Sequence, residues 1–496
     1  MSSFSFPNEL IALTLDALDV PSLLRCMQVC KQFQSIILQS SALLYKISLF
    51  SAQMSDVEHC NWDLPSRLNA IRRYTDAWDN LQFPICTQIP MENGQAWNLV
   101  NGVLAQAGSD GGISCVQMPC SIKGISEHRW VTPTDVRIRD FAIDMTQDLL
   151  VAIELGGDGL QAGRDVHLRS WTTGLAHPKA MRPMIIAEFF DQQFLAHFLI
   201  RVCGPHVGIL FDGPWLHQTT AALAIWDWRT GSQKMLMRGP EFHSFAFISD
   251  DLFLVAFVDG GQLSFRVLPV TLGNSMSSAE DAQYLCEMRF PILRGTVEEV
   301  SIISEPSSTS TVPNIPAAPF TAFTDVLFTV TLRYSVGMDF ESAVVFLIPR
   351  STILYHVSCV SISSQKHLEW ESWGPKGSRV LDIEPSNFWV YHSYGMKFIH
   401  TRLGEAVASM YNFNPYARRK DMNTTDSHLP WKAMEKETKI SGERNPFDID
   451  VVTSLPGREA SLELMADEHG WEATMITEDH VVMVQWEGRM FAYMAM

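Results

Sequence analysis

The four residues Trp171-Thr172-Thr173-Gly174 recur 57 positions later as Trp228-Arg229-Thr230-Gly231. A second echo relates Asp148–Ile153 to Asp251–Phe257, in which an acidic residue precedes a run of apolar residues. Short apolar runs bounded by Gly, Asp, Asn and Pro are typical of β-strands. From about residue 83 onward, the chain therefore has the pattern of strands arranged in repeated units.

The spacing of these units predicts a propeller. Each expected repeat has one apolar anchor at its centre: Val103, Val151, Ile209, Val255, Phe328, Val390 and Val482. A four-stranded blade takes about 40–50 residues, so about seven blades fit. The two longest steps contain the polar segments Ser304–Pro319 and Pro415–Pro446, which we expect to be surface loops that folding does not require. A pair of β-sandwiches is the alternative.

The repeats resemble a known family. Trp226-Asp227 and the two Trp-x-Thr-Gly sequences resemble WD repeats, although the Gly-His signature of that family is absent. The resemblance implies a diverged, WD-like propeller. Because a closed ring leaves no free sheet edge, we expect Met490–Met494 to be an ordered strand near the first blade, around Asn98–Gln106.

The first eighty residues have helical periodicity instead. Ile11, Leu15 and Leu18 are spaced i, i+4, i+7, and Asp19 stands in a capping position before Pro21. We expect three or four short amphipathic helices within about 45 residues. A longer helix should follow, with Pro65 in its first turn and an apolar stripe formed by Leu64, Leu68, Ile71, Thr75 and Trp78.

Three segments of this helical region resemble the F-box family. They are Phe6–Leu10, Leu18–Cys26 and Val29–Phe33, and the family pattern has Leu where this chain has Phe6. The resemblance implies binding to a Skp-family adaptor and, through it, to a cullin-based ubiquitin ligase. The positions that match adaptor-facing positions of the family are Pro7, Leu10, Leu23, Leu24, Val29 and Phe33. Packing in the domain's own core is the alternative for each of them.

Further similarity extends the resemblance over most of the chain. Glu371–Pro375, Trp389–Gly395 and Asn412–Tyr416 resemble fungal F-box proteins with a C-terminal region of this kind. The expected fold is mainly β with an N-terminal α-helical F-box. The expected domains are the F-box at residues 1–50, linker helices at 51–82 and a propeller-like substrate-binding domain at 83–496.

The resemblance implies the substrate-recognition subunit of an SCF-type ubiquitin ligase, which is not itself an enzyme. Its partners would be a Skp-family adaptor, a cullin and a protein substrate that the sequence does not identify. The alternatives are a propeller enzyme, such as a hydrolase or lyase, and an F-box scaffold that targets nothing for degradation.

Charge and cysteine usage restrict the partners and the compartment. The chain has 37 Lys and Arg against 55 Asp and Glu, a net charge of −18, so we expect it to bind neither nucleic acid nor a membrane surface. Its longest apolar runs have the length of strands and no secretory signal is evident. The nine cysteines lack paired spacing, which predicts a reducing intracellular location, cytoplasmic or nuclear or both.

Motifs that carry chemistry are few. Gly157–Ala162 matches the dinucleotide fingerprint, but a strand-like sequence follows where a helix is required, so a hairpin loop is the better interpretation. Asp448 and Asp450 alternate as on a strand, and an exposed pair is favoured over an acid–base pair. Arg418–Lys420 is the one basic run and favours a solvated loop. We predict no catalytic residue, no metal site and no cofactor.

Overall fold

Five helices form the N-terminal part of the chain in the computed structural model. They are α1 (Asn8–Asp16), α2 (Val20–Val29), α3 (Lys31–Gln39), α4 (Ser41–Ala52) and α5 (Leu64–Asp79). Asp19 and Asp63 cap α2 and α5, because their carboxylates accept hydrogen bonds from the backbone N–H groups of Ser22 and Ser66. A proline lies in the first turn of both helices, so the helices predicted from the sequence are confirmed.

The structure describes residues 7–496 except 58, 95, 110, 157–161, 190–196, 213–220, 271–282, 307–317, 323–324, 337–340, 363–365, 384–390, 418–429, 443–444 and 468. Within the described residues no single helix is long and apolar enough to cross a membrane. The helices α3 and α4 pass that test only as a pair, across a bend of 85°.

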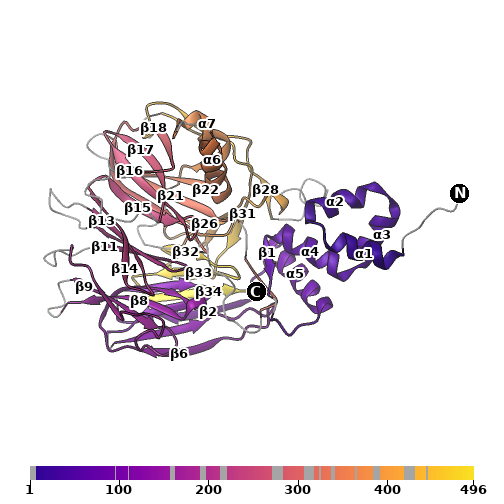
Figure 1. Ribbon diagram of the computed structural model, residues 1–496, viewed down its shortest axis with the longest axis horizontal. Coiled ribbons are helices and arrows are strands. Elements are labelled where there is room, and N and C mark those ends of the chain that lie inside the picture. The colour runs from indigo at the N-terminus through magenta and orange to yellow at the C-terminus, as the bar shows by residue number, and fades with distance from the viewer. Residues whose placement is uncertain are drawn as a thin grey trace.

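Seven sheets of four or more strands follow the helices and form the blades of a propeller (Figure 1). The first three are β3 (Trp97–Val100), β4 (Val103–Ala107), β5 (Gly112–Gln117) and β6 (His128–Pro133); β7 (Ile138–Asp144), β8 (Leu149–Leu155), β9 (Ala162–Ser170) and β10 (Met184–Ile186); and β11 (His197–Cys203), β12 (His206–Asp212), β13 (Ala221–Asp227) and β14 (Ser232–Gly239). The short 3-10 helix η1 (Met145–Gln147) joins β7 to β8.

The fourth and fifth blades are linked by an insertion. Their strands are β15 (Phe242–Phe247), β16 (Leu252–Asp259), β17 (Gln262–Pro269) and β18 (Cys286–Ile292); and β19 (Thr296–Ile303), β21 (Leu327–Ser335), β22 (Glu341–Pro349) and β24 (Arg379–Leu381). Between β22 and β24 the chain forms α6 (Arg350–Ile362), β23 (His367–Leu368) and α7 (Trp370–Gly377). Strand β23 pairs in parallel with β18, so the inserted segment joins the edge of the fourth blade.

The sixth and seventh blades complete the ring. Their strands are β25 (Ser393–Tyr394), β26 (Lys397–Thr401), β27 (Val407–Asn412) and β31 (Arg458–Glu463), with β28 (Lys432–Ala433) paired to β31; and β32 (Ala473–Ile476), β33 (His480–Gln485), β34 (Met490–Ala495) and β2 (Ile85–Pro90). Two small sheets lie outside the blades: β1 (Met54–Asp56) with β20 (Phe320–Ala322), and β29 (Thr438–Ile440) with β30 (Val451–Thr453).

The last blade closes the ring with a strand from each end of the propeller sequence. Strand β34 pairs with β33 on one side and with β2 on the other, so the prediction that Met490–Met494 is an ordered strand is confirmed. The sequence did not predict the pairing of β34 with β2. The first blade lies face-on against it, as Trp97 and Phe491 show with ring centroids 5.3 Å apart.

The repeat anchors fall at equivalent places. Six of them lie in the second strand of their blades, which are the first five and the seventh: β4, β8, β12, β16, β21 and β33. The seventh, Val390, lies outside the described residues, and the second strand of that blade is β26. Both Trp-x-Thr-Gly sequences are the turn that follows the third strand of their blade. The seven-bladed prediction is confirmed, and the alternative of two β-sandwiches is wrong.

Packing between blades explains why so many strands are buried on both faces. One hydrophobic cluster joins the second and third blades and contains Val151 and Ile209, and the next joins the third and fourth and contains Leu210 and Val255. Each central strand thus contributes alternate side chains to two clusters.

The two polar segments were only partly predicted correctly. Residues 307–317 and 418–429 lie outside the described residues. The described ends of the segments are not surface loops: Ala318 of the first segment is buried, and Trp431 of the second is buried against α5. The prediction of a wholly exposed second segment is therefore wrong, because β28 and β29 also belong to it.

Candidate functional site

The helices α1–α4 form a small domain with a small core. Its buried apolar side chains are Leu15, Leu23, Ile37 and Leu43, and six partly buried ones pack around them. A core of this size cannot bury every apolar residue that the helices carry. The helices α1–α3 lie at the end of the molecule away from the propeller, and α4 and α5 lie between them and the propeller (Figure 1).

The structure places the six predicted adaptor-facing residues in two groups. Leu10, Leu24 and Val29 are exposed by 49%, 36% and 70%; Pro7 is also exposed and Phe33 partly so. Leu23 has no exposed surface and packs in the core of the domain, which is the alternative given for it above. Adaptor contact remains a prediction for the other five.

Two further exposed leucines belong to the same helices and were not predicted. Leu13 in α1 is 69% exposed and Leu38 in α3 is 51% exposed. Leu13 does not share the helical spacing of Ile11, Leu15 and Leu18, which form the buried stripe. This difference in spacing is the sequence feature that could have predicted its exposure.

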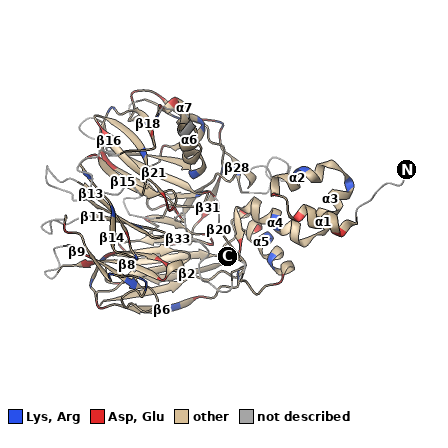
Figure 2. Cartoon of the chain, viewed as in Figure 1, with Lys and Arg blue, Asp and Glu red and all other residues tan. Residues whose placement is uncertain are grey.

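The charge on this surface is sparse and balanced. Figure 2 shows only isolated charged positions on α1–α4, which carry Glu9 and Asp16 in α1, Arg25 in α2, Lys31 in α3 and Lys46 in α4, with Asp19 capping α2. A surface of this kind fits a partner that binds through apolar contacts.

The long helix α5 is held on the propeller by a buried turn. The Glu478 carbonyl, between β32 and β33, accepts hydrogen bonds from the Tyr74 hydroxyl at 2.7 Å and from Trp78 Nε1 at 3.2 Å. The carboxylates of Glu478 and Asp479 both pair with Lys123. Burial alone would lower the pKa of Lys123, but these two carboxylates outweigh burial and raise it, so the ammonium stays charged.

Other contacts fix the helical region from different sides. The Tyr45 hydroxyl bonds the Asp56 carboxylate at 2.8 Å and the Pro319 carbonyl at 3.0 Å. Asn414 Nδ2 donates to the Ser51 carbonyl at 2.9 Å. Strand β1 pairs with β20, which the chain supplies between the first two strands of the fifth blade. Because these anchors come from several blades, the helical domain and the propeller have a defined relative position.

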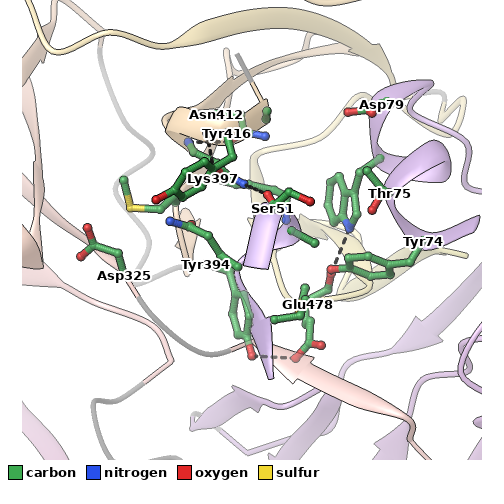
Figure 3. Close-up of a pocket in the computed structure, with 18 of the residues that line it drawn as sticks. Ser51, Tyr74, Thr75, Asp79, Asp325, Tyr394, Lys397, Asn412, Tyr416 and Glu478 are labelled. Atoms are coloured by element: carbon green, nitrogen blue, oxygen red, sulfur yellow. Dashed lines mark hydrogen bonds between the residues drawn. The ribbon is translucent and has the colours of Figure 1, made fainter. Parts of the chain in front are cut away.

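A cavity of about 370 Å³ lies where α4 and α5 meet the propeller. Figure 3 shows Tyr74, Thr75 and Asp79 of α5 on one side and Asp325 on the other, with Tyr394 and Lys397 between. Its size is within the range of small-molecule sites. Sequence reasoning did not identify it, because its walls come from residues as far apart as Ser48 and Glu478.

The centre of the propeller offers much less space. A cavity of about 50 Å³ is lined by β3, β7, β11 and β15, the first strands of the first four blades, and by Glu305 and Tyr391. Burial raises the pKa of Asp140, close to Arg201, to about 6. This volume is below the usual range for a small-molecule site.

The remaining sequence candidates do not assemble into a site. Asp448 and Asp450 are exposed, and they precede β30 instead of lying on a strand, so that part of the prediction is wrong. Two candidates lie outside the described residues: residues 157–161 of the Gly-rich segment and Arg418–Lys420. The strands on either side of the Gly-rich segment, β8 and β9, pair in an antiparallel hairpin. Among the described residues, no group of three His, Cys, Asp or Glu side chains could hold a metal ion.

Comparison with known proteins agrees with the helical domain. Residues 5–49 match the family model described as F-box-like. No protein of curated function matches the chain significantly in sequence.

Similar solved structures include a WD40 domain and the protein Sqt1. The WD40 domain of Toxoplasma gondii coronin is 8% identical, with a TM-score of 0.36, and the alignment covers 78% of this chain and 89% of that one. Sqt1 from Chaetomium thermophilum is 10% identical, with a TM-score of 0.37, and the alignment covers 82% of this chain and 84% of that one. Sqt1 bound to the N-terminus of ribosomal protein L10 gives 10% identity, a TM-score of 0.36 and the same coverage.

Proposed function

We propose that this chain, an F-box-like domain followed by a seven-bladed propeller, is the substrate-recognition subunit of an SCF-type cullin ubiquitin ligase. The observation that carries the proposal is the match of residues 5–49 to the F-box-like family together with exposed apolar side chains on α1–α3. In this role residues 1–50 bind a Skp-family adaptor, residues 51–82 set the distance and residues 83–496 bind a protein substrate.

The attachment of α5 supports this division of labour. Ubiquitin transfer needs a substrate held at a defined position relative to the ligase, and reactive geometry gains most when the parts do not move independently. Glu478 binds α5 through two hydrogen bonds, and the cluster around it is buried. The architecture fits a non-catalytic adaptor. All nine cysteines are free thiols, which supports a reducing compartment, the cytoplasm or the nucleus.

Co-purification of the full chain with a Skp-family adaptor tests the first step. A stable complex of one copy each on size-exclusion chromatography is expected; absence of a complex at micromolar concentration would contradict the proposal. The second step is tested in cells. Proteins captured by the propeller should accumulate on proteasome inhibition, whereas unchanged levels would favour an F-box scaffold that targets nothing for degradation.

A further inference from the structure

The cavity between the helices and the propeller has walls of two kinds. Ser51 and Ala52 come from the end of α4 and Trp78 from α5. Tyr394 and Lys397 come from the sixth blade, and Tyr416 from the segment between its strands β27 and β31. Aromatic rings form part of the wall, and charged side chains form the rest: Lys397, Arg72 and Arg458 with the carboxylates of Asp76, Asp79, Asp325 and Glu478. In sites for small molecules, apolar surface holds the body of the ligand and polar groups orient it.

Lys397 is the unusual member of this lining. Its Nζ lies 4.2 Å from the centroid of the Trp78 ring, and no described residue forms a hydrogen bond or ion pair with it. Burial lowers the pKa of Lys397 to about 8, because the carboxylates of Glu478 and Asp479 compensate for burial only in part. A lysine desolvated in this way gains from an anion that pairs with it.

The acidic groups around the cavity already have partners. Glu478 accepts hydrogen bonds from Thr321 and Tyr394 in addition to its pairing with Lys123. Asp79 pairs with Arg458 at 2.8 Å. Asp325 accepts from the backbone N–H groups of Val326 and Ser351 and from the Ser351 hydroxyl. The other charged residues in the lining, Arg72 and Asp76, are solvent-exposed residues of α5.

We propose that this cavity binds a small organic anion, whose acidic group pairs with Lys397 Nζ and whose apolar body lies against Trp78 and Tyr394. The anion would touch α4, α5 and the propeller at once. This site is separate from the proposed adaptor surface on α1–α3 and needs neither adaptor nor substrate, so it can be tested on the isolated full chain.

Two fluorescent dyes with nearly the same aromatic body make a matched pair of probes. One is 8-anilino-1-naphthalenesulfonate, which carries a sulfonate, and the other is N-phenyl-1-naphthylamine, which is neutral. We expect the full chain to bind the sulfonate dye at least tenfold more tightly than the neutral one. The substitution Lys397→Met should remove this preference and leave binding of the neutral dye unchanged, whereas Lys397→Arg should retain the preference.

Two controls locate the binding. Lys439→Met removes an exposed lysine that pairs with Asp450 and does not line the cavity, so the preference should persist. Ala52→Trp places a large ring on the α4 wall and should weaken both dyes together. Equal affinity of the two dyes for the unaltered chain, or an unchanged preference in Lys397→Met, would overturn the proposal; so would unchanged binding in Ala52→Trp.

A measurement on the unaltered chain keeps the proposal falsifiable if a variant fails to fold. The preference for the sulfonate dye should decline between pH 7 and pH 9.5 as Lys397 loses its proton, while the sulfonate stays ionised. Tyr74 and Tyr394 stay neutral over this range, because burial raises the pKa of both well above the ordinary value. A preference that is constant over this range would show that Lys397 is not the group that binds the anion.

Discussion

Arg458 of the sixth blade and Asp79 at the end of α5 form an ion pair of 2.8 Å in which the side chains are only 3% and 7% exposed. The Arg458 guanidinium also lies 4.5 Å from the centroid of the Trp431 ring, and Trp431 Nε1 donates to the Trp78 carbonyl at 3.1 Å. The pair therefore fastens the C-terminal end of the linker helix to the propeller.

Asp79→Ala should destabilise the junction strongly. It leaves the buried guanidinium without its carboxylate, and breaking a buried pair in this way costs about 3–5 kcal/mol. Chemical denaturation of the full chain measures the loss. Glu405→Ala is the matched control, since its pair with Arg402 is exposed by 50% and 78% and should contribute less than about 1 kcal/mol. Equal effects of the two substitutions would contradict this role of Asp79.

Closure of the ring predicts a large effect at its last strand. Phe491 of β34 is fully buried and packs edge-on against Trp97 of the first blade. Phe491→Ala should cost about 3–5 kcal/mol in the free energy of unfolding. Trp486→Ala, at a position that is 43% exposed, is the control and should have a small effect. Removal of residues 488–496 should make the whole propeller sensitive to protease; a resistant core of unchanged size would contradict closure by β34.

The two groups of predicted F-box residues should respond differently to substitution. Val29→Glu, at a position 70% exposed, should leave the melting temperature unchanged and weaken adaptor binding by about 2 kcal/mol or more, roughly 30-fold. Leu23→Ala should instead lower the stability of the helical domain by about 2–5 kcal/mol, because it opens a cavity in the core.

Calorimetry for binding and thermal unfolding for stability separate these effects. Leu175→Glu, which places the same charge at a 68% exposed position on the propeller, is the control and should alter neither. Unchanged adaptor affinity in a folded Val29→Glu variant would remove this residue from the proposed interface.

Glu287 gives the fold an acid-sensitive point. It is buried between the fourth blade and the inserted segment; burial would raise its pKa, but hydrogen bonds from His367, Arg266 and Arg289 outweigh burial and lower the pKa from the ordinary 4.5 to about 2. Because the folded value is the lower one, the stabilisation is complete above about pH 4.5 and is lost as the pH falls toward 2.

Glu287→Gln should therefore cost on the order of 3 kcal/mol at pH 7, and its difference from the unaltered chain should shrink as the pH falls from 4.5 toward 2. Denaturant titrations over this pH range measure both effects. Glu369→Gln is the control, because its side chain is 62% exposed and it contacts only Arg289 among these groups. A difference that does not depend on pH would show that the Glu287 charge is not what stabilises this contact.

The type and order of the elements could be predicted because they follow from local patterns. The helix stripe from Leu64 to Trp78 repeats every three or four residues, and it forms α5. The anchors Val103 and Val151 sit in equivalent strands because a four-stranded unit has a nearly constant length. No motif in the sequence predicted α6 and α7, which are inserted between two strands of one blade.

Burial and assembly depend on segments that are distant in the sequence. Leu23 and Leu24 are neighbours of the same type in α2, yet only Leu23 is enclosed, since the core cluster that contains it is completed by Ile37 and Leu43 of the next two helices. The burial of Lys397 likewise could not be predicted from the residues around it in the sequence. Its environment exists only because the ring brings Trp78, more than 300 positions away, against the sixth blade, and sequence spacing carries no record of that contact.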